Sequence, residues 1–122
     1  MKFGEKIQSA DWKAEKHVPV IEAPDKAKAD EWFTVKVSVG KEIPHPNTLE
    51  HHIRWIQLYF QPKDSKFVFL LGQAEFSAHG EANAFTHPTA QFTVKVNVSG
   101  TLLALSLCNI HGLWENSQVL AV

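Results

Sequence analysis

The stretch Phe33-Thr34-Val35-Lys36-Val37-Ser38-Val39 decides the fold class of this chain. Apolar and polar side chains alternate along it without a break, which is typical of a β-strand with one buried face. Gly40 follows directly, and glycine often marks the end of such a strand. The stretch therefore predicts a strand over 33–39 in an all-β protein.

Similar patterns recur on both sides of this stretch. The run 67–71 is continuously apolar and predicts a strand covered on both faces, while Ser99-Gly100 predicts a tight reversal between two strands. The further predicted strands are 53–60, 92–98, 101–108, a short terminal one within 113–122, and ones near 17–22 and 74–79. About seven short strands indicate an immunoglobulin-like β-sandwich or barrel, and residues 1–122 form a single domain.

Composition excludes several classes of protein. Twelve basic and thirteen acidic residues give a net charge of -1, which argues against a nucleic-acid binder. No apolar stretch is long enough to span a membrane, and residues 1–6 lack the apolar segment of a secretion signal, so we expect a cytoplasmic protein. The one cysteine, Cys108, excludes an internal disulfide bond and a site with several thiolates from one chain.

Three short segments combine histidine with other possible metal ligands. They are EKHVP at residues 15–19, HPNTLEHHI at 45–53 and CNIH at 108–111. The spacing Cys-x-x-His is common in metal sites, because two intervening residues let the chain curl and direct both donors at one ion. Two prolines flank His45 and restrict the backbone there. The segments together predict a metal site.

Other histidines are expected to lie outside this site. His52 should point away from His51 if a strand begins there, so we expect its ring to be packed or solvated. His79 and His87 belong to polar loops and are not expected to be ligands. Trp114, three residues after His111, is expected to shield one edge of the metal site.

The three segments, in this order along the chain, resemble those of the superoxide reductase family, called neelaredoxin in its one-iron form. The resemblance extends over nearly the whole sequence. It implies an immunoglobulin-like fold and a mononuclear non-haem iron with four equatorial histidines and one axial thiolate. Carried over by motif position, the ligands are His17, His45, His51, His111 and Cys108.

The resemblance also implies roles for two neighbouring charged residues. Glu15 would bind the sixth position of the iron in the oxidised form, and Lys16 would lie near the open position in the reduced form. The implied reaction is the one-electron reduction of superoxide to hydrogen peroxide. Because Cys108 is the only thiol, the chain lacks the four-cysteine iron module of the related two-iron proteins. An external donor such as rubredoxin is therefore implied, as is a homo-oligomer, often a tetramer.

Two other readings compete with this one. A blue-copper electron carrier is also a β-sandwich with a Cys–His loop, but its site takes two histidines, one cysteine and a weak axial methionine. The only methionine here is Met1, and the loop at 45–52 offers more histidines than that site needs. An interaction domain without a metal would leave the loop around His45 unexplained. Metal content separates the three: iron, copper or none.

Overall fold

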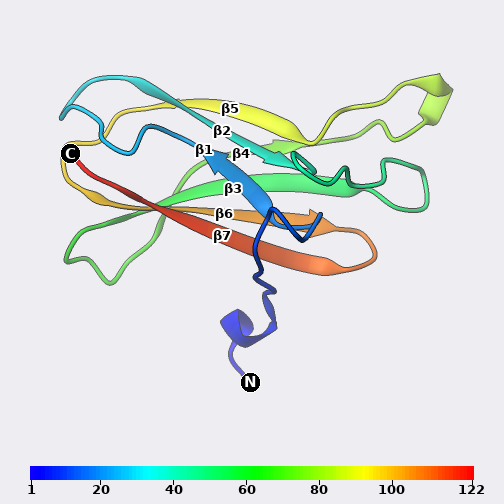
Figure 1. The fold of residues 1–122 in the computed structure, drawn as a ribbon, viewed down its shortest axis with the longest axis horizontal. Coiled ribbons are helices and arrows are strands. Elements are labelled where there is room, and N and C mark those ends of the chain that lie inside the picture. The colour runs from blue at the N-terminus through cyan, green and yellow to red at the C-terminus, as the bar shows by residue number, and fades with distance from the viewer.

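The computed structural model describes all residues from 1 to 122 and is built almost entirely of β-strands (Figure 1). The only helices are two short 3-10 turns, Phe3–Lys6 and Glu81–Asn83, and neither is long and apolar enough to cross a membrane. The strands are β1 Pro19–Glu22, β2 Phe33–Val39, β3 Ile53–Pro62, β4 Phe69–Glu75, β5 Thr89–Val94, β6 Gly100–Cys108 and β7 Gly112–Leu120.

The seven strands form two antiparallel sheets, which confirms the predicted immunoglobulin-like sandwich. One sheet has the order β1-β2-β5 and the other the order β4-β3-β6-β7. In Figure 1 strands β2 and β5 of the first sheet lie above β3, β6 and β7 of the second, and the sheets are not closed into a barrel. The core lies between them and is formed mainly by apolar side chains from β2, β3 and β6.

The strands with regular alternation are found where the sequence predicts them. Strand β2 has the predicted bounds, and its residues Val35, Val37 and Val39 are buried. In β3 the side chains of Ile56 and Leu58 are fully buried. One-sided burial selects this period-two pattern, because every second side chain of a strand faces the same layer.

The prediction for residues 67–79 is wrong in two respects. Strand β4 begins at Phe69 and runs to Glu75, so there is one strand here and no separate strand near 74–79. It is an edge strand paired only with β3, and Phe67–Leu70 are about half exposed. The continuous apolar run therefore does not reflect cover on both faces.

The predicted reversal at Ser99-Gly100 is also wrong. Strand β5 pairs with β2 in the first sheet, whereas β6 pairs with β3 and β7 in the second. The segment after Val94 therefore crosses from one sheet to the other, and Val96 is buried without belonging to a strand.

The strand pairing brings three chain segments to one end of the sandwich. Ile53, the first residue of β3, pairs with Cys108, the last residue of β6. Pro19, the first residue of β1, pairs with Val39, the last residue of β2. The segment before β1, the β2–β3 loop and the β6–β7 turn consequently meet at that end.

Candidate metal centre

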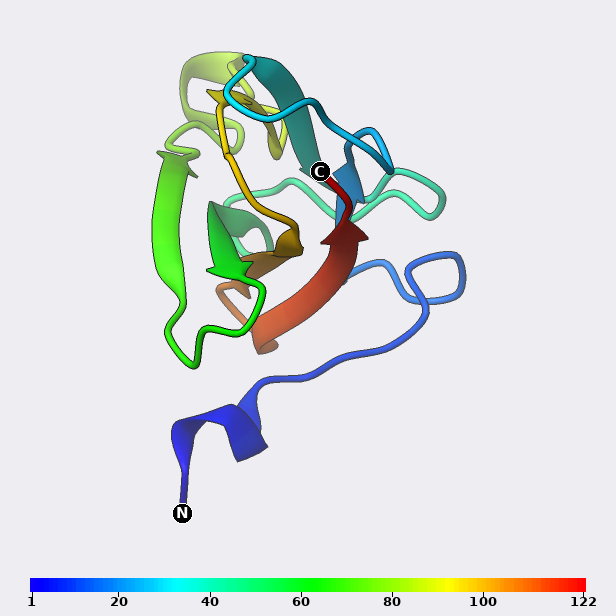
Figure 2. The same ribbon diagram turned by 90° about the vertical axis from the view of Figure 1, so that its left-hand side faces the viewer.

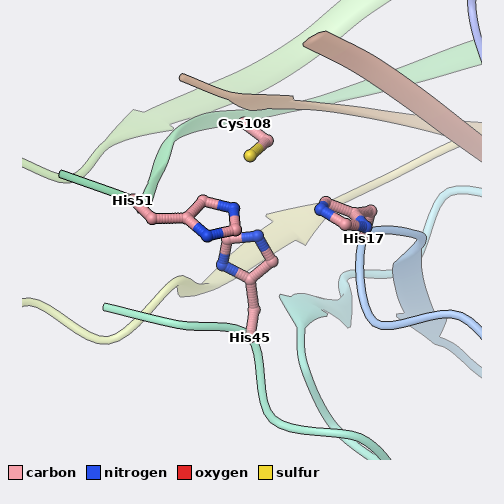
Figure 3. A group of neighbouring side chains, drawn as sticks. All are labelled: His17, His45, His51 and Cys108. Carbon is pink, nitrogen blue, oxygen red and sulfur yellow. The ribbon is translucent and has the colours of Figure 1, made fainter. Parts of the chain in front are cut away.

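Four potential metal ligands meet at this end of the sandwich. Their donor atoms all lie within 4.8 Å of one another, and the residues are His17, His45, His51 and Cys108. Figure 3 shows the three imidazole rings and the Cys108 sulfur arranged around a common space. They come from the segment before β1, from the β2–β3 loop and from the end of β6. The three segments are 28 or more positions apart in the sequence, and their ligand residues are neighbours only because of the strand pairing.

His111 joins the cluster through its Nδ1 atom. This nitrogen lies 3.1 Å from Nε2 of His17 and 3.7 Å from Sγ of Cys108. The backbone N–H of His111 also donates to the Cys108 sulfur at 3.4 Å. The tight β6–β7 turn, with Gly112 at a φ of 78°, lets the chain curl so that both donors of the Cys-x-x-His segment face one point.

Hydrogen bonds fix which nitrogen of two rings faces the site. Nδ1 of His45 donates to the carbonyl oxygen of Pro46 at 2.7 Å, and Nδ1 of His17 donates to Oε1 of Glu15 at 2.6 Å. In each ring the bond leaves Nε2 without a proton and facing the site. A metal-binding histidine commonly donates its other N–H to an oxygen in this way, which fixes the orientation of the ring.

The donor set fits a metal ion. Nε2 of His45 and Nε2 of His51 are buried and have no hydrogen-bond partner, although buried polar atoms are nearly always paired. Both atoms belong to the cluster, so an ion bound there would satisfy them together. Imidazole nitrogens combined with one thiolate suit iron, copper or zinc, and four imidazoles exceed the two histidines of a blue-copper site.

The electrostatic environment favours the neutral form of His45 and of His51. Burial lowers the pKa of His45 to about 4, an effect that the charges of His17, His51 and Lys16 reinforce. Burial also lowers the pKa of His51, together with the charges of His111 and His17. Neutral imidazole is the form that binds metals, so the site is ready for an ion at neutral pH.

Glu15 and Lys16 lie beside the cluster. The Glu15 carboxylate accepts hydrogen bonds from the side chain and the backbone N–H of His17, and the side-chain bond is the main reason that its pKa is lowered. Lys16 forms no salt bridge, yet its charge contributes to the low pKa values of His45 and His51. The expected roles of Glu15 as a sixth ligand and of Lys16 near the open position stay predictions.

The surroundings of the cluster contain one residue that the sequence pointed to and one that it did not. The Trp114 ring stacks on His17 with centroids 4.8 Å apart, as expected of a residue shielding the site. Asn47, which no sequence pattern identified, links the β2–β3 loop to the backbone of Thr86. The only sequence feature that could have pointed to Asn47 is its position between His45, which two prolines flank, and the pair His51-His52.

The fold and the site together define a class of protein: a β-sandwich with a group of imidazoles and one thiol, able to bind a metal, at one end of the sandwich. A family model described as desulfoferrodoxin matches residues 9–117. The chain belongs to this family, which includes the superoxide reductases, and the resemblance inferred from the motifs is thereby confirmed.

Similar proteins extend over essentially the whole chain. A superoxide reductase of Pyrococcus furiosus is 54% identical over 97% of this chain and 98% of its own length. A neelaredoxin of Megalodesulfovibrio gigas is 51% identical over 100% of this chain and 99% of its own. The solved structure of the superoxide reductase (neelaredoxin) from Archaeoglobus fulgidus in the reduced form has a TM-score of 0.88 and 53% identity, covering 96% of this chain and 99% of that one.

Proposed function

We propose that the chain is a superoxide reductase that reduces superoxide to hydrogen peroxide by one electron at a mononuclear non-haem iron. The observation that carries the proposal is the cluster of five donors with two orphaned buried nitrogens. The names of relatives that match the whole chain support the activity. The ligands would be His17, His45, His51, His111 and Cys108.

When bound, the iron would supply the electron for superoxide and an open position for the anion. Cys108 is buried, and as a thiolate it would hold the iron and donate electron density to it. Glu15 holds the His17 ring with Nε2 directed into the site, and Trp114 covers one side of that ring. These residues therefore fix the site before any substrate enters.

Lys16 would attract and orient the substrate. Its ammonium group lacks a salt-bridge partner, so its charge is available to an approaching anion. The net charge of -1 gives the molecule no general attraction for superoxide, and steering must come from this local charge. Lys16 would also donate a hydrogen bond to the anion in the site.

The source of electrons must lie outside the chain. With one cysteine there are too few thiols for a second cysteine-bound iron centre. We therefore propose an external donor such as rubredoxin. By resemblance to the family we also propose a homo-oligomer, such as a tetramer, that works in the cytoplasm.

The decisive experiment mixes reduced, iron-loaded protein with excess superoxide and follows hydrogen peroxide and dioxygen. Superoxide dismutates slowly by itself to peroxide and dioxygen, so both products are compared with a control without protein. Above that control we expect one equivalent of peroxide without matching dioxygen, and catalysis only when reduced rubredoxin or another donor is added. Release of dioxygen sustained above the control without a donor would instead show a dismutase. Metal analysis of the anaerobically purified protein comes first, since copper or no metal at all would contradict the proposal.

A further inference from the structure

We propose that His79 is a positioning residue for the metal ligands His45 and His51, although it binds no metal itself. The inference rests on the proposed function, because it concerns how the iron ligands are held. His79 is buried and lies in the connection between β4 and β5, outside the ligand cluster. It belongs to a second pair of histidines behind the ligand loop, formed with His52.

Both ring nitrogens of His79 are engaged by oxygen atoms. Nδ1 donates to Oδ1 of Asn47 at 3.0 Å, and Nε2 lies 2.8 Å from the carbonyl oxygen of Phe76. The orientation of the Asn47 amide is set by its other end, since Nδ2 donates to the carbonyl oxygen of Thr86 at 3.0 Å. Neither nitrogen of His79 is free for an ion, so its contribution must be to hold Asn47.

Asn47 connects this hydrogen-bond chain to the first ligand. It lies two residues after His45, and Pro46 between them has a fixed φ and accepts the hydrogen bond from Nδ1 of His45. A shift of Asn47 would therefore move the acceptor that orients the His45 ring. Through Asn47, His79 ties this part of the loop to the β4–β5 connection.

The ring of His79 also supports the second ligand. It stacks on His52 with centroids 3.6 Å apart and an angle of 6° between the planes. His52 directly follows His51, and its Nδ1 donates to the carbonyl oxygen of Thr48 within the same loop at 2.9 Å. The stack and the bonds to Asn47 thus hold both ends of the segment 45–52.

The geometry assigns His79 more than a packing role. A buried ring that merely filled space could be apolar, whereas this one donates a hydrogen bond to Asn47 that an apolar ring would leave unmade. Residues outside the ligand shell that orient ligands typically change metal affinity 10- to 100-fold when replaced. We expect an effect of about that size here.

The test uses the full iron-loaded protein and the variants His79→Phe and Asn47→Ala. His79→Phe keeps a ring that can stack on His52 but removes the hydrogen bond to Asn47, and Asn47→Ala removes the same link from the loop side. In both we expect iron to dissociate about 10- to 100-fold faster. We also expect a shifted thiolate-to-iron absorption band and a changed midpoint potential.

Two control variants separate positioning from loss of stability. His87→Ala replaces an exposed histidine of the same β4–β5 connection. Leu120→Ala weakens the core where β7 pairs with Gly100, at the end of the sheet opposite Cys108. Both controls should keep the wild-type absorption band and midpoint potential, even if Leu120→Ala unfolds more readily.

Each outcome decides the inference. The inference is overturned if folded His79→Phe and Asn47→Ala have the absorption band, the midpoint potential and the iron dissociation rate of the wild type. It is also overturned if Leu120→Ala shows the same shift of the absorption band as these two variants. If His79→Phe does not fold, Asn47→Ala alone decides. A wild-type protein that takes up no iron would overturn the proposed function itself, which is a different result from normal iron uptake with unperturbed variants.

Discussion

Cys108 is the residue on which the chemistry of the centre depends most. Its sulfur is buried at the end of β6, close to Nδ1 of His111. We expect Cys108→Ser to abolish the thiolate-to-ferric absorption of the oxidised protein, because the alcohol is a much weaker donor than the thiolate. Visible spectra recorded at equal iron content measure the effect. Colour that survives with iron still bound would show that the thiol is not a ligand.

His45 makes the stability of the metal-free protein depend on pH. Its pKa of about 4 in the folded state lies below its ordinary value of 6.5, so the unfolded chain binds the proton more tightly. Stability is therefore complete above about pH 6.5 and falls as the pH drops toward 4, by about 1–3 kcal/mol after allowance for solvent screening.

Urea unfolding of the metal-free protein between pH 7 and 4.5 checks this dependence. In His45→Gln the side chain no longer titrates. We therefore expect the free energy of unfolding of this variant to depend less on pH than that of the wild type. An equal slope in both proteins would assign the acid sensitivity to other groups. In the iron-loaded protein the same protons compete with the metal, so iron should be lost over the acidic part of this range.

The β2–β3 loop owes its course to Gly40, which ends β2. Gly40 has a φ of 90°, and a Cβ atom placed there would lie 2.7 Å from the backbone nitrogen of His45. Gly40→Ala therefore strains the backbone and pushes against His45, one of the proposed ligands. We expect it to cost about 1–3 kcal/mol of stability and to weaken iron binding.

Urea unfolding and iron dissociation, measured together, check this expectation. Gly4→Ala is the matched control, because a Cβ atom at Gly4 meets nothing within 4 Å. If Gly40→Ala binds iron as the wild type does, the loop tolerates displacement of its first residues. The conformation at Gly40 would then have no influence on how His45 binds iron.

At the scale of the whole molecule, the small net charge makes local charge decisive. We expect Lys16→Ala to slow the reaction of the reduced protein with superoxide about tenfold and to flatten its dependence on ionic strength, since a steering charge is lost. Stopped-flow kinetics at several salt concentrations measure both effects. If the rate of the wild-type reaction with superoxide does not depend on ionic strength, steering by Lys16 is contradicted.

Glu15→Ala should act differently from Lys16→Ala. We expect the rate with superoxide to stay nearly unchanged while the spectrum of the oxidised form is altered, because the carboxylate would cap the site in that form. Its bond to His17 gives the carboxylate a second way of influencing the spectrum. Equal losses of rate in the two variants, or no change in either, would contradict separate roles.

The sequence by itself determined the features that depend on local order. The alternation of apolar and polar residues over 33–39 and 53–60 indicates strands with one buried face. It predicted β2 and the start of β3 correctly. The Cys-x-x-His spacing and the proline-flanked His45 identified ligand candidates, since a short spacing restricts where two donors can point. All of this is contained in neighbouring residues.

Only the tertiary structure decided which distant segments meet. Alternation does not state a strand's partner, so the crossing after Val94 and the exposed edge position of β4 were not predicted. The contact of His79 with Asn47 joins residues 32 positions apart. Such contacts are selected by the burial of whole sheets against each other, a property of the complete chain that no short segment contains.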